Sequence, residues 1–332
     1  MSDAQFDVLA IGNAIVDILV QIDDRFLNTH DLIKGAMGLV DADALQTLYN
    51  KIGPGLECSG GSAANTIAGI ASLGGRGAFI GKVHDDHLGR VFTNDMRANG
   101  VHFETAPTAK GARTATSLVL VTPDAERTMQ TYLGACVELS PDDIDTKEIL
   151  ASEVTYLEGY LWDPPAAKQA FIKAAEIAHS ADREVSLSLS DPFCVDRHRA
   201  DFVALVDGHV DILFANEEEI MSLYQAETFD EALAAVTGQC KIAALTRSAE
   251  GCVIVRGDEA FTVAAETVDE VVDTTGAGDA FAAGFLAGYT QGRDLVTSAR
   301  MANIAASEAI SRLGARPAVC LADLIAERIS AN

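Results

Sequence analysis

The sequence predicts an α/β protein with one large, mainly parallel sheet and a second, smaller sheet. From Val154 onward, short apolar runs typical of strands alternate with helical stretches. This alternation indicates a parallel sheet that is covered by helices on both faces. The small sheet is predicted by two β-rich runs, at 114–122 and 127–133, on either side of a hairpin signal. Strands expected near 15–22 and 35–41 would complete this small sheet.

The remaining elements follow from their local patterns. Residues 6–11 are an apolar run that ends at Gly12-Asn13, as expected of a buried strand. Pro123-Asp124-Ala125-Glu126 supplies the hairpin turn. Further strands are expected at 78–83, 154–157, 185–190, 212–214, 242–245 and 252–255. Helices are expected at 43–50, within 60–73, from 86, at 165–180 and at 280–289. No repeat or linker interrupts this order, so residues 1–332 are expected to form one domain.

Composition narrows the classes of function. The 332 residues carry a net charge of −25, which disfavours binding to nucleic acid or to an anionic membrane. The six cysteines are scattered, and the seven histidines form no metal-spaced set. The N-terminus has no signal-peptide pattern, and no run reaches the roughly 18 apolar residues of a membrane helix. A soluble, cytoplasmic protein without a membrane partner is expected.

The stretch 272–281 carries the strongest chemical signal. Gly276, Ala277 and Gly278 precede an Ala/Gly/Phe/Leu run of helical character. The free N–H groups at a helix start bind anions, and glycines allow a phosphate to come close. Asp279 would repel that phosphate unless it accepts a proton from an attacking hydroxyl. The alternative, a tight turn with an Asp helix cap, is about equally favoured by this stretch alone.

A second glycine-rich stretch favours the interpretation as a phosphate site. Gly60-Gly61-Ser62-Ala63-Ala64-Asn65-Thr66 lies far upstream of Asp279. The two stretches, in this order, resemble the signatures of the ribokinase-like (PfkB) family of carbohydrate and nucleoside kinases. The resemblance covers roughly residues 6–320. The resemblance implies a three-layer α/β/α sandwich with a β-sheet lid formed by about 13–41 and 108–135. It also implies an ATP-dependent phosphotransferase in which Asp279 is the general base and Gly276–Gly278 form the anion hole.

The resemblance also implies where the acceptor binds. Asp17 is a lone acid in an apolar run, which is costly unless it is hydrogen-bonded, exposed at a sheet edge or functional. In the family, the matching Asp binds the hydroxyl groups of the sugar. Arg127 either reaches the transferred phosphate or is an exposed lid arginine, and both interpretations are equally open. The residues implied in substrate binding are Asn13, Asp17, Gly61, Ser62, Asn65, Arg127, Glu158 and Tyr160.

ATP and Mg²⁺ follow from the same resemblance. Asn216 and Glu219 match an Asn-x-x-Glu motif that binds Mg²⁺ through ordered water. Thr246, Gly251 and Asn303 match nucleotide-contacting positions, although Asn303 is also expected to pack in a core helix. Asp273, Thr275, Arg312 and Gly314 resemble a monovalent-cation loop. Ala318 replaces a serine ligand of that loop, so a K⁺ requirement is left open.

The sequence determines the identity of the acceptor substrate less well than the type of reaction. Three stretches resemble the adenosine kinases of the family: 188–193, 210–217 and 158–160. Adenosine is therefore the first candidate, and another sugar or nucleoside is the alternative. A nucleoside-binding protein without catalysis is a third hypothesis. The Walker, dinucleotide-binding and protein-kinase signatures are absent from the sequence. Monomer and lid-to-lid homodimer are both compatible with the sequence.

Overall fold

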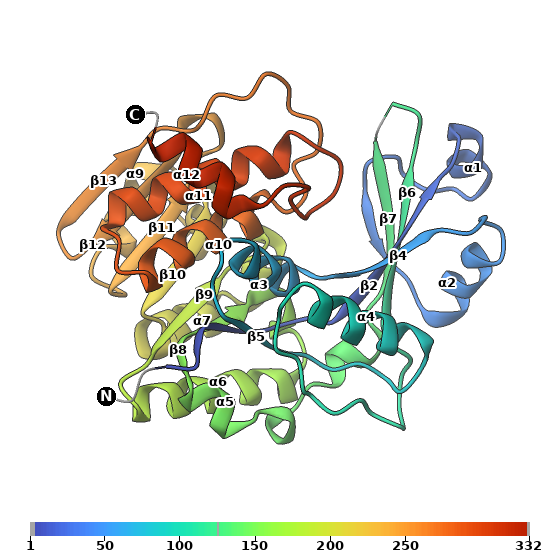
Figure 1. The fold of residues 1–332 in the computed structure, drawn as a ribbon, viewed down its shortest axis with the longest axis horizontal. Coiled ribbons are helices and arrows are strands. Elements are labelled where there is room, and N and C mark those ends of the chain that lie inside the picture. The colour runs from blue at the N-terminus through green and yellow to red at the C-terminus, as the bar shows by residue number, and fades with distance from the viewer. Residues whose placement is uncertain (1–3, 125, 331–332) are drawn as a thin grey trace.

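A computed structural model describes residues 4–124 and 126–330. Its main feature is an eight-stranded sheet (Figure 1). The strands, in spatial order, are β13 (Glu259–Val263), β12 (Cys252–Arg256), β11 (Ile242–Thr246), β10 (Ile212–Asn216), β9 (Glu184–Ser188), β8 (Ser152–Glu158), β1 (Phe6–Ile11) and β5 (Gly77–Ile80). The pairs β11–β12 and β12–β13 are antiparallel, and the other neighbours pair parallel. The predicted parallel sheet is confirmed.

Helices cover both faces of this sheet and give the predicted three layers. Alternate residues of β1 enter different cores: Val8 packs on one side, and Leu9 and Ile11 on the other. The first layer contains α3 (Ser62–Ser72), α4 (His87–Ala98), α10 (Ala277–Thr290), α11 (Leu295–Ile310) and α12 (Leu321–Ser330). The second contains α5 (Thr146–Leu150), α6 (Pro165–Ser180), α7 (Pro192–His209), α8 (Glu217–Tyr224) and α9 (Phe229–Val236). Short 3₁₀ turns complete the fold: η1 (Gly134–Glu138), η2 (Pro141–Asp143), η3 (Gly159–Trp162) and η4 (Ser248–Glu250).

A five-stranded sheet, here called sheet B, extends from one side of this body (Figure 1). Its order is β3 (Met37–Leu39), β7 (Arg127–Tyr132), β6 (Ala115–Val121), β2 (Ile15–Gln21) and β4 (Leu56–Gly60). β6 and β7 form the predicted hairpin, of which Ala125 lies outside the described residues. The sequence analysis did not assign β4. α1 (Asp24–Thr29) and α2 (Ala42–Tyr49) each contribute a leucine to the core under sheet B.

The strands β5 and β9 end earlier than predicted. β5 stops at Ile80, because the chain then turns toward Thr108, whose N–H donates to the carbonyl of Val83 (2.9 Å). β9 stops at Ser188, because Ser190 has a φ of +70° that cannot continue a strand.

Close packing of α10 against its neighbours places the start of α10 precisely. Gly69 of α3 faces Ala283, and a Cβ at Gly69 would lie 2.7 Å from that side chain. Gly284 faces α11, where a Cβ would lie 2.6 Å from Ala302 Cα. Both contacts leave no room for a larger side chain. The helices on either side therefore fix the position of α10 and of the loop before it.

We expect Gly284→Ala to destabilise the protein, because the added methyl group forces α10 and α11 apart. The cost should be about 1–3 kcal/mol of unfolding free energy, as for other overpacked cores. Gly208→Ala on α7 is the matched control, since a Cβ there meets nothing within 4 Å. It should be neutral or stabilise by up to about 1 kcal/mol. Urea unfolding of the three proteins measures the difference, and equal midpoints would contradict this packing.

Candidate active site

The loop before α10 is shaped by Gly276. Its φ is +78°, and a Cβ would lie 2.6 Å from the carbonyl oxygen of Ala315. A side chain is therefore excluded by conformation and by space. A Cβ at Gly278 would meet nothing within 4 Å, so the start of the helix is open on that side. Ala277 N–H donates to Thr274 O (3.2 Å), so this predicted anion-hole donor has a competing acceptor.

Asp279 lies in the first turn of α10 and is bound by α3. Ser62 Oγ donates to its Oδ1 (2.6 Å), and Asn65 Nδ2 donates to its Oδ2 (3.1 Å). Burial raises the pKa of Asp279 to about 6, although both hydrogen bonds and the charge of Arg316 oppose this increase. The alternative of Asp279 as a helix cap is wrong, because Gly276 is the N-cap residue. The carboxylate is instead shared between two helices at an open helix start.

Glu158, at the end of β8, connects the loop after β1 to the first turn of α3. Its Oε1 accepts from Asn13 Nδ2 (2.6 Å), and its Oε2 accepts from the N–H groups of Ala63 (2.8 Å) and Asn13 (3.2 Å). Burial raises the pKa of Glu158 to about 7. Asn13 Oδ1 is buried and has no hydrogen-bond partner among the described residues. This unpaired oxygen is a ready acceptor for a substrate hydroxyl.

Gly61 connects this cluster to α3. Its φ is +99°, and a Cβ would collide with the carbonyl oxygen of Asn13. Glycine is therefore required where the loop after β1 meets the first turn of α3.

Tyr160, on η3, is 43% exposed and leaves its ring accessible at the same edge of the sheet.

Asp17 lies on β2, which is paired on both sides, so an edge-strand position is excluded. Burial raises the pKa of Asp17 to about 6, while Arg127 and Arg316 lower it. The two arginines therefore compensate part of the cost of burying this carboxylate.

Arg127 is not an exposed lid arginine, and that alternative was wrong. Its Nη1 binds Asp273 Oδ2 at 2.7 Å, and both side chains are only 8% exposed. Asp273 also accepts from the N–H groups of Thr275 (2.9 Å) and Gly314 (3.0 Å). Burial raises the pKa of Asp273, but these bonds outweigh it and the pKa is lowered. The ion pair therefore ties sheet B to the loop before α10.

The predicted cation loop is only partly assembled. Asp273, Thr275 and Gly314 come together, but the guanidinium of Arg312 pairs with Glu308 (2.6 Å). Among residues 4–124 and 126–330, no group of three or more His, Cys, Asp or Glu side chains could hold a metal ion. A site for K⁺ stays a prediction.

Asn216 and Glu219 form a capping box at the start of α8. Glu219 Oε1 accepts from Asn216 Nδ2 (2.8 Å), and Oε2 accepts from the Asn216 N–H (3.0 Å). Burial raises the pKa of Glu219 to about 7. Each carboxylate oxygen keeps a further lone pair. These lone pairs could accept from metal-bound water, and a Mg²⁺ site at this pair stays a prediction.

The predicted nucleotide residues Thr246 and Gly251 lie at the end of β11 and directly before β12, whereas Asn303 lies within α11. Thr246 lies directly opposite Asn216 in the register of β10 and β11. Gly251 has a φ of +88°, and a Cβ would collide with Val263 O. Asn303 Nδ2 donates to Ala264 O (2.8 Å), so its amide nitrogen connects α11 to the end of β13. This contact favours the packing role for Asn303, and its contact with a nucleotide stays a prediction.

Sequence reasoning missed Arg316 and Asp95. Arg316 donates to Asn65 Oδ1 (3.2 Å) and to Asp95 Oδ2 (3.3 Å). Neither residue belongs to a motif that the sequence analysis used. The only available signal was a cation close to Gly314, in a loop expected to bind cations.

The chain is similar to known kinases over nearly its full length. The family model described as pfkB family carbohydrate kinase matches residues 56–320. The crystal structure of adenosine kinase from Sinorhizobium meliloti is 54% identical, covers 98% of this chain and 100% of its own, and has a TM-score of 0.89. A probable sugar kinase from Rhizobium etli is 51% identical, with 98% and 99% covered and a TM-score of 0.90.

More distant relatives have other names. Probable fructokinase-4 of Arabidopsis thaliana is 27% identical over 326 residues, which is 94% of this chain and 96% of that protein. The names of the relatives therefore include both nucleoside and sugar kinases. The family model spans more than half of the chain, and the matched residues 56–320 include both glycine stretches and Asp279. This chain belongs to the pfkB family of carbohydrate kinases.

Proposed function

We propose that this kinase transfers the γ-phosphoryl group of ATP to the primary hydroxyl of adenosine, forming AMP and ADP. The observation that supports the reaction type best is the carboxylate of Asp279 at the open start of α10. Its two hydrogen bonds, to Ser62 and Asn65, fix its direction. With a pKa of about 6 it is ionised at neutral pH and basic enough to accept a proton.

The proposed step is an in-line displacement. The acceptor oxygen forms a bond to the γ-phosphorus while the bond from that phosphorus to the β–γ bridging oxygen breaks, and ADP leaves. Asp279 takes the hydroxyl proton on a lone pair that Ser62 and Asn65 do not use. The N–H groups of Gly276–Gly278 would face the transferring phosphoryl oxygens, and that of Ala277 would have to leave Thr274 O to do so. Loss of one such donor costs on the order of 3 kcal/mol in comparable sites.

Mg²⁺, when bound, would neutralise charge on the β- and γ-phosphate oxygens. Asn216 and Glu219 would hold it through water, and Thr246 is placed beside them at the end of β11. We further propose that sheet B acts as a lid. The ion pair between Arg127 and Asp273 connects sheet B to the loop before α10. A closed lid would exclude water from the phosphoryl group.

The face of sheet B opposite its core supports adenosine as the acceptor, because Leu56 and Met37 on it are exposed, although Val119 between them is buried. Val16, Ile18 and Val20 of β2 enter the core, so the residues between them point to the opposite face. One row of directly paired residues on that face is entirely apolar: Leu56, Leu19, Val119, Met129 and Met37. Asp17 lies on the same face, two residues from Leu19. A purine base on the apolar row and a ribose near Asp17 would satisfy both.

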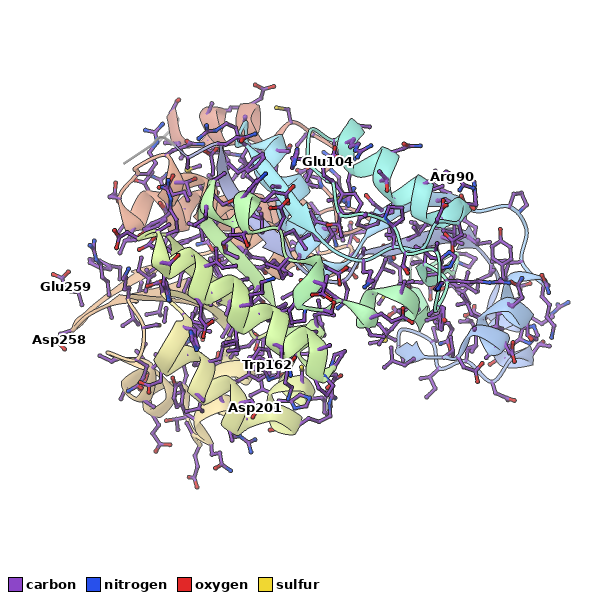
Figure 2. All side chains as sticks on the ribbon, turned by 90° about the horizontal axis from the view of Figure 1, so that it is seen from below. Arg90, Glu104, Trp162, Asp201, Asp258 and Glu259 are labelled. Carbon is purple, nitrogen blue, oxygen red and sulfur yellow. The ribbon has the colours of Figure 1, made fainter. Side chains whose placement is uncertain are left out.

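Asp279→Asn should lower kcat by a factor of about 10² to 10⁴, because the amide cannot accept the hydroxyl proton. Asp258→Asn is the matched control, since Asp258 is exposed at the turn between β12 and β13 (Figure 2). It should retain wild-type kcat. ADP formation by each purified protein gives the comparison. A kcat for Asp279→Asn within a few-fold of wild type would exclude Asp279 as the base.

Among adenosine, guanosine, inosine, ribose and fructose, adenosine should give the highest kcat/KM with Mg²⁺ and ATP. A free sugar carries hydroxyl groups over most of its surface, and the apolar row of sheet B offers these hydroxyls no hydrogen-bond partner. If fructose or ribose is preferred, the chain is a sugar kinase of the same family and the assignment of the apolar row is wrong. Adenosine binding without turnover would instead indicate a nucleoside-binding protein.

A further inference from the structure

Arg316 occupies the centre of a network behind the proposed base. Its Nε donates to Asn65 Oδ1 (3.2 Å), its Nη1 to Asp95 Oδ2 (3.3 Å) and its Nη2 to Met96 Sδ (3.7 Å). The side chain is 21% exposed, so most of it is removed from water. A guanidinium in this position contacts both α3 and α4 from the loop that follows α11.

Asn65 lies between two groups of opposite character. Its amide oxygen accepts from Arg316, and its amide nitrogen donates to Asp279 Oδ2 (3.1 Å). A guanidinium can only donate and a carboxylate can only accept. One orientation of the amide satisfies both, so Arg316 determines that the nitrogen of Asn65 faces Asp279.

Asp95 fixes Arg316 in turn and connects it to sheet B. Its Oδ2 also accepts from the N–H (2.8 Å) and the Oγ (2.5 Å) of Ser59. Ser59 belongs to β4, the edge strand that leads through Gly60-Gly61 into α3. Arg316 therefore joins sheet B, α4 and α3 at the point where the sheet leaves the body.

Charged and titratable groups face Asp279 from several elements. Arg316 is a cation and opposes the increase in pKa that burial causes at Asp279. The negative charge of Asp279 in turn raises the pKa of the Glu158 carboxyl, because two neighbouring negative charges repel each other. The groups that interact with Asp279 are Ser62 and Asn65 of α3, Tyr156 and Glu158 of β8, Tyr160 of η3, and Arg316.

We infer that Arg316 is a positioning residue of the phosphotransfer reaction, which orients Asn65 and through it holds Asp279 toward the acceptor hydroxyl. This inference rests on the proposed function. Arg316 acts through Asn65 and needs no contact with either substrate. Its charge has a second effect, because it favours the ionised form of Asp279 that accepts the proton.

The test compares Arg316→Gln and Arg316→Lys, each in the wild-type and in the Asn65→Ala background. Gln keeps a donor without the charge, and Lys keeps the charge without the planar fork. Arg90→Gln is the control, because Arg90 is exposed on α4, where it pairs with Asp85 (Figure 2). For each protein, kcat and kcat/KM for the preferred acceptor are measured from about pH 5 to pH 9, and thermal unfolding checks the fold.

Arg316→Gln should move the acid limb of kcat/KM to higher pH by about one unit, because the pKa of Asp279 rises when the cation is lost. Asp279 must be ionised to act, so activity is then lost at a higher pH than in the wild type. Arg316→Lys should keep the acid limb. On the alkaline plateau both variants should lose kcat by on the order of 10- to 100-fold, and this loss should largely vanish in the Asn65→Ala background.

An unmoved acid limb in Arg316→Gln, or equal losses of kcat with and without Asn65, would overturn the inference. If Arg316→Gln does not fold, the Arg316→Lys series decides through its dependence on Asn65. A wild-type protein that phosphorylates none of the acceptors would contradict the proposed function, and the inference with it. An active wild type with additive losses would contradict the inference alone.

Discussion

The two hydrogen bonds from α3 to Asp279 are the constraint on which the site depends. A carboxylate beside the proposed phosphate site would be repelled by the phosphate, so it must be held by donors. Ser62 and Asn65 supply them from one turn of α3. This works only if α3 and α10 lie side by side, which the contact of Gly69 with Ala283 allows. Packing in the first helical layer thus determines the direction of the proposed base.

The second feature of the site is its concentration of acids. The pKa values of Asp17 and Asp279 are both about 6, and that of Glu158 is about 7, and in each case burial is the main cause. Arg127 and Arg316 compensate part of the cost of burying Asp17, and Arg316 does the same for Asp279. Both arginines also join sheet B to the body. The two charges that lower these pKa values therefore also connect the lid to the body.

The sequence predicted the architecture well because it is encoded locally. Apolar runs, glycines with positive φ and the capping residue Asp86 each determine their own element. It missed β4, because the run from Leu56 to Gly60 has little β-branched character and is stabilised by pairing with β2. It also missed Arg316 and Asp95. Their roles arise from contacts between segments 221 residues apart, which no local pattern records.

A crystal structure of the Asp279→Asn protein with adenosine, ATP and Mg²⁺ would test the central claim most directly. The account predicts that the 5′ oxygen of adenosine lies within about 3.2 Å of the side chain of residue 279, with the γ-phosphate against Gly276–Gly278. Asp17 is the competing carboxylate, since its pKa is also about 6. A reacting hydroxyl that is bound to Asp17 and out of reach of residue 279 would contradict the account.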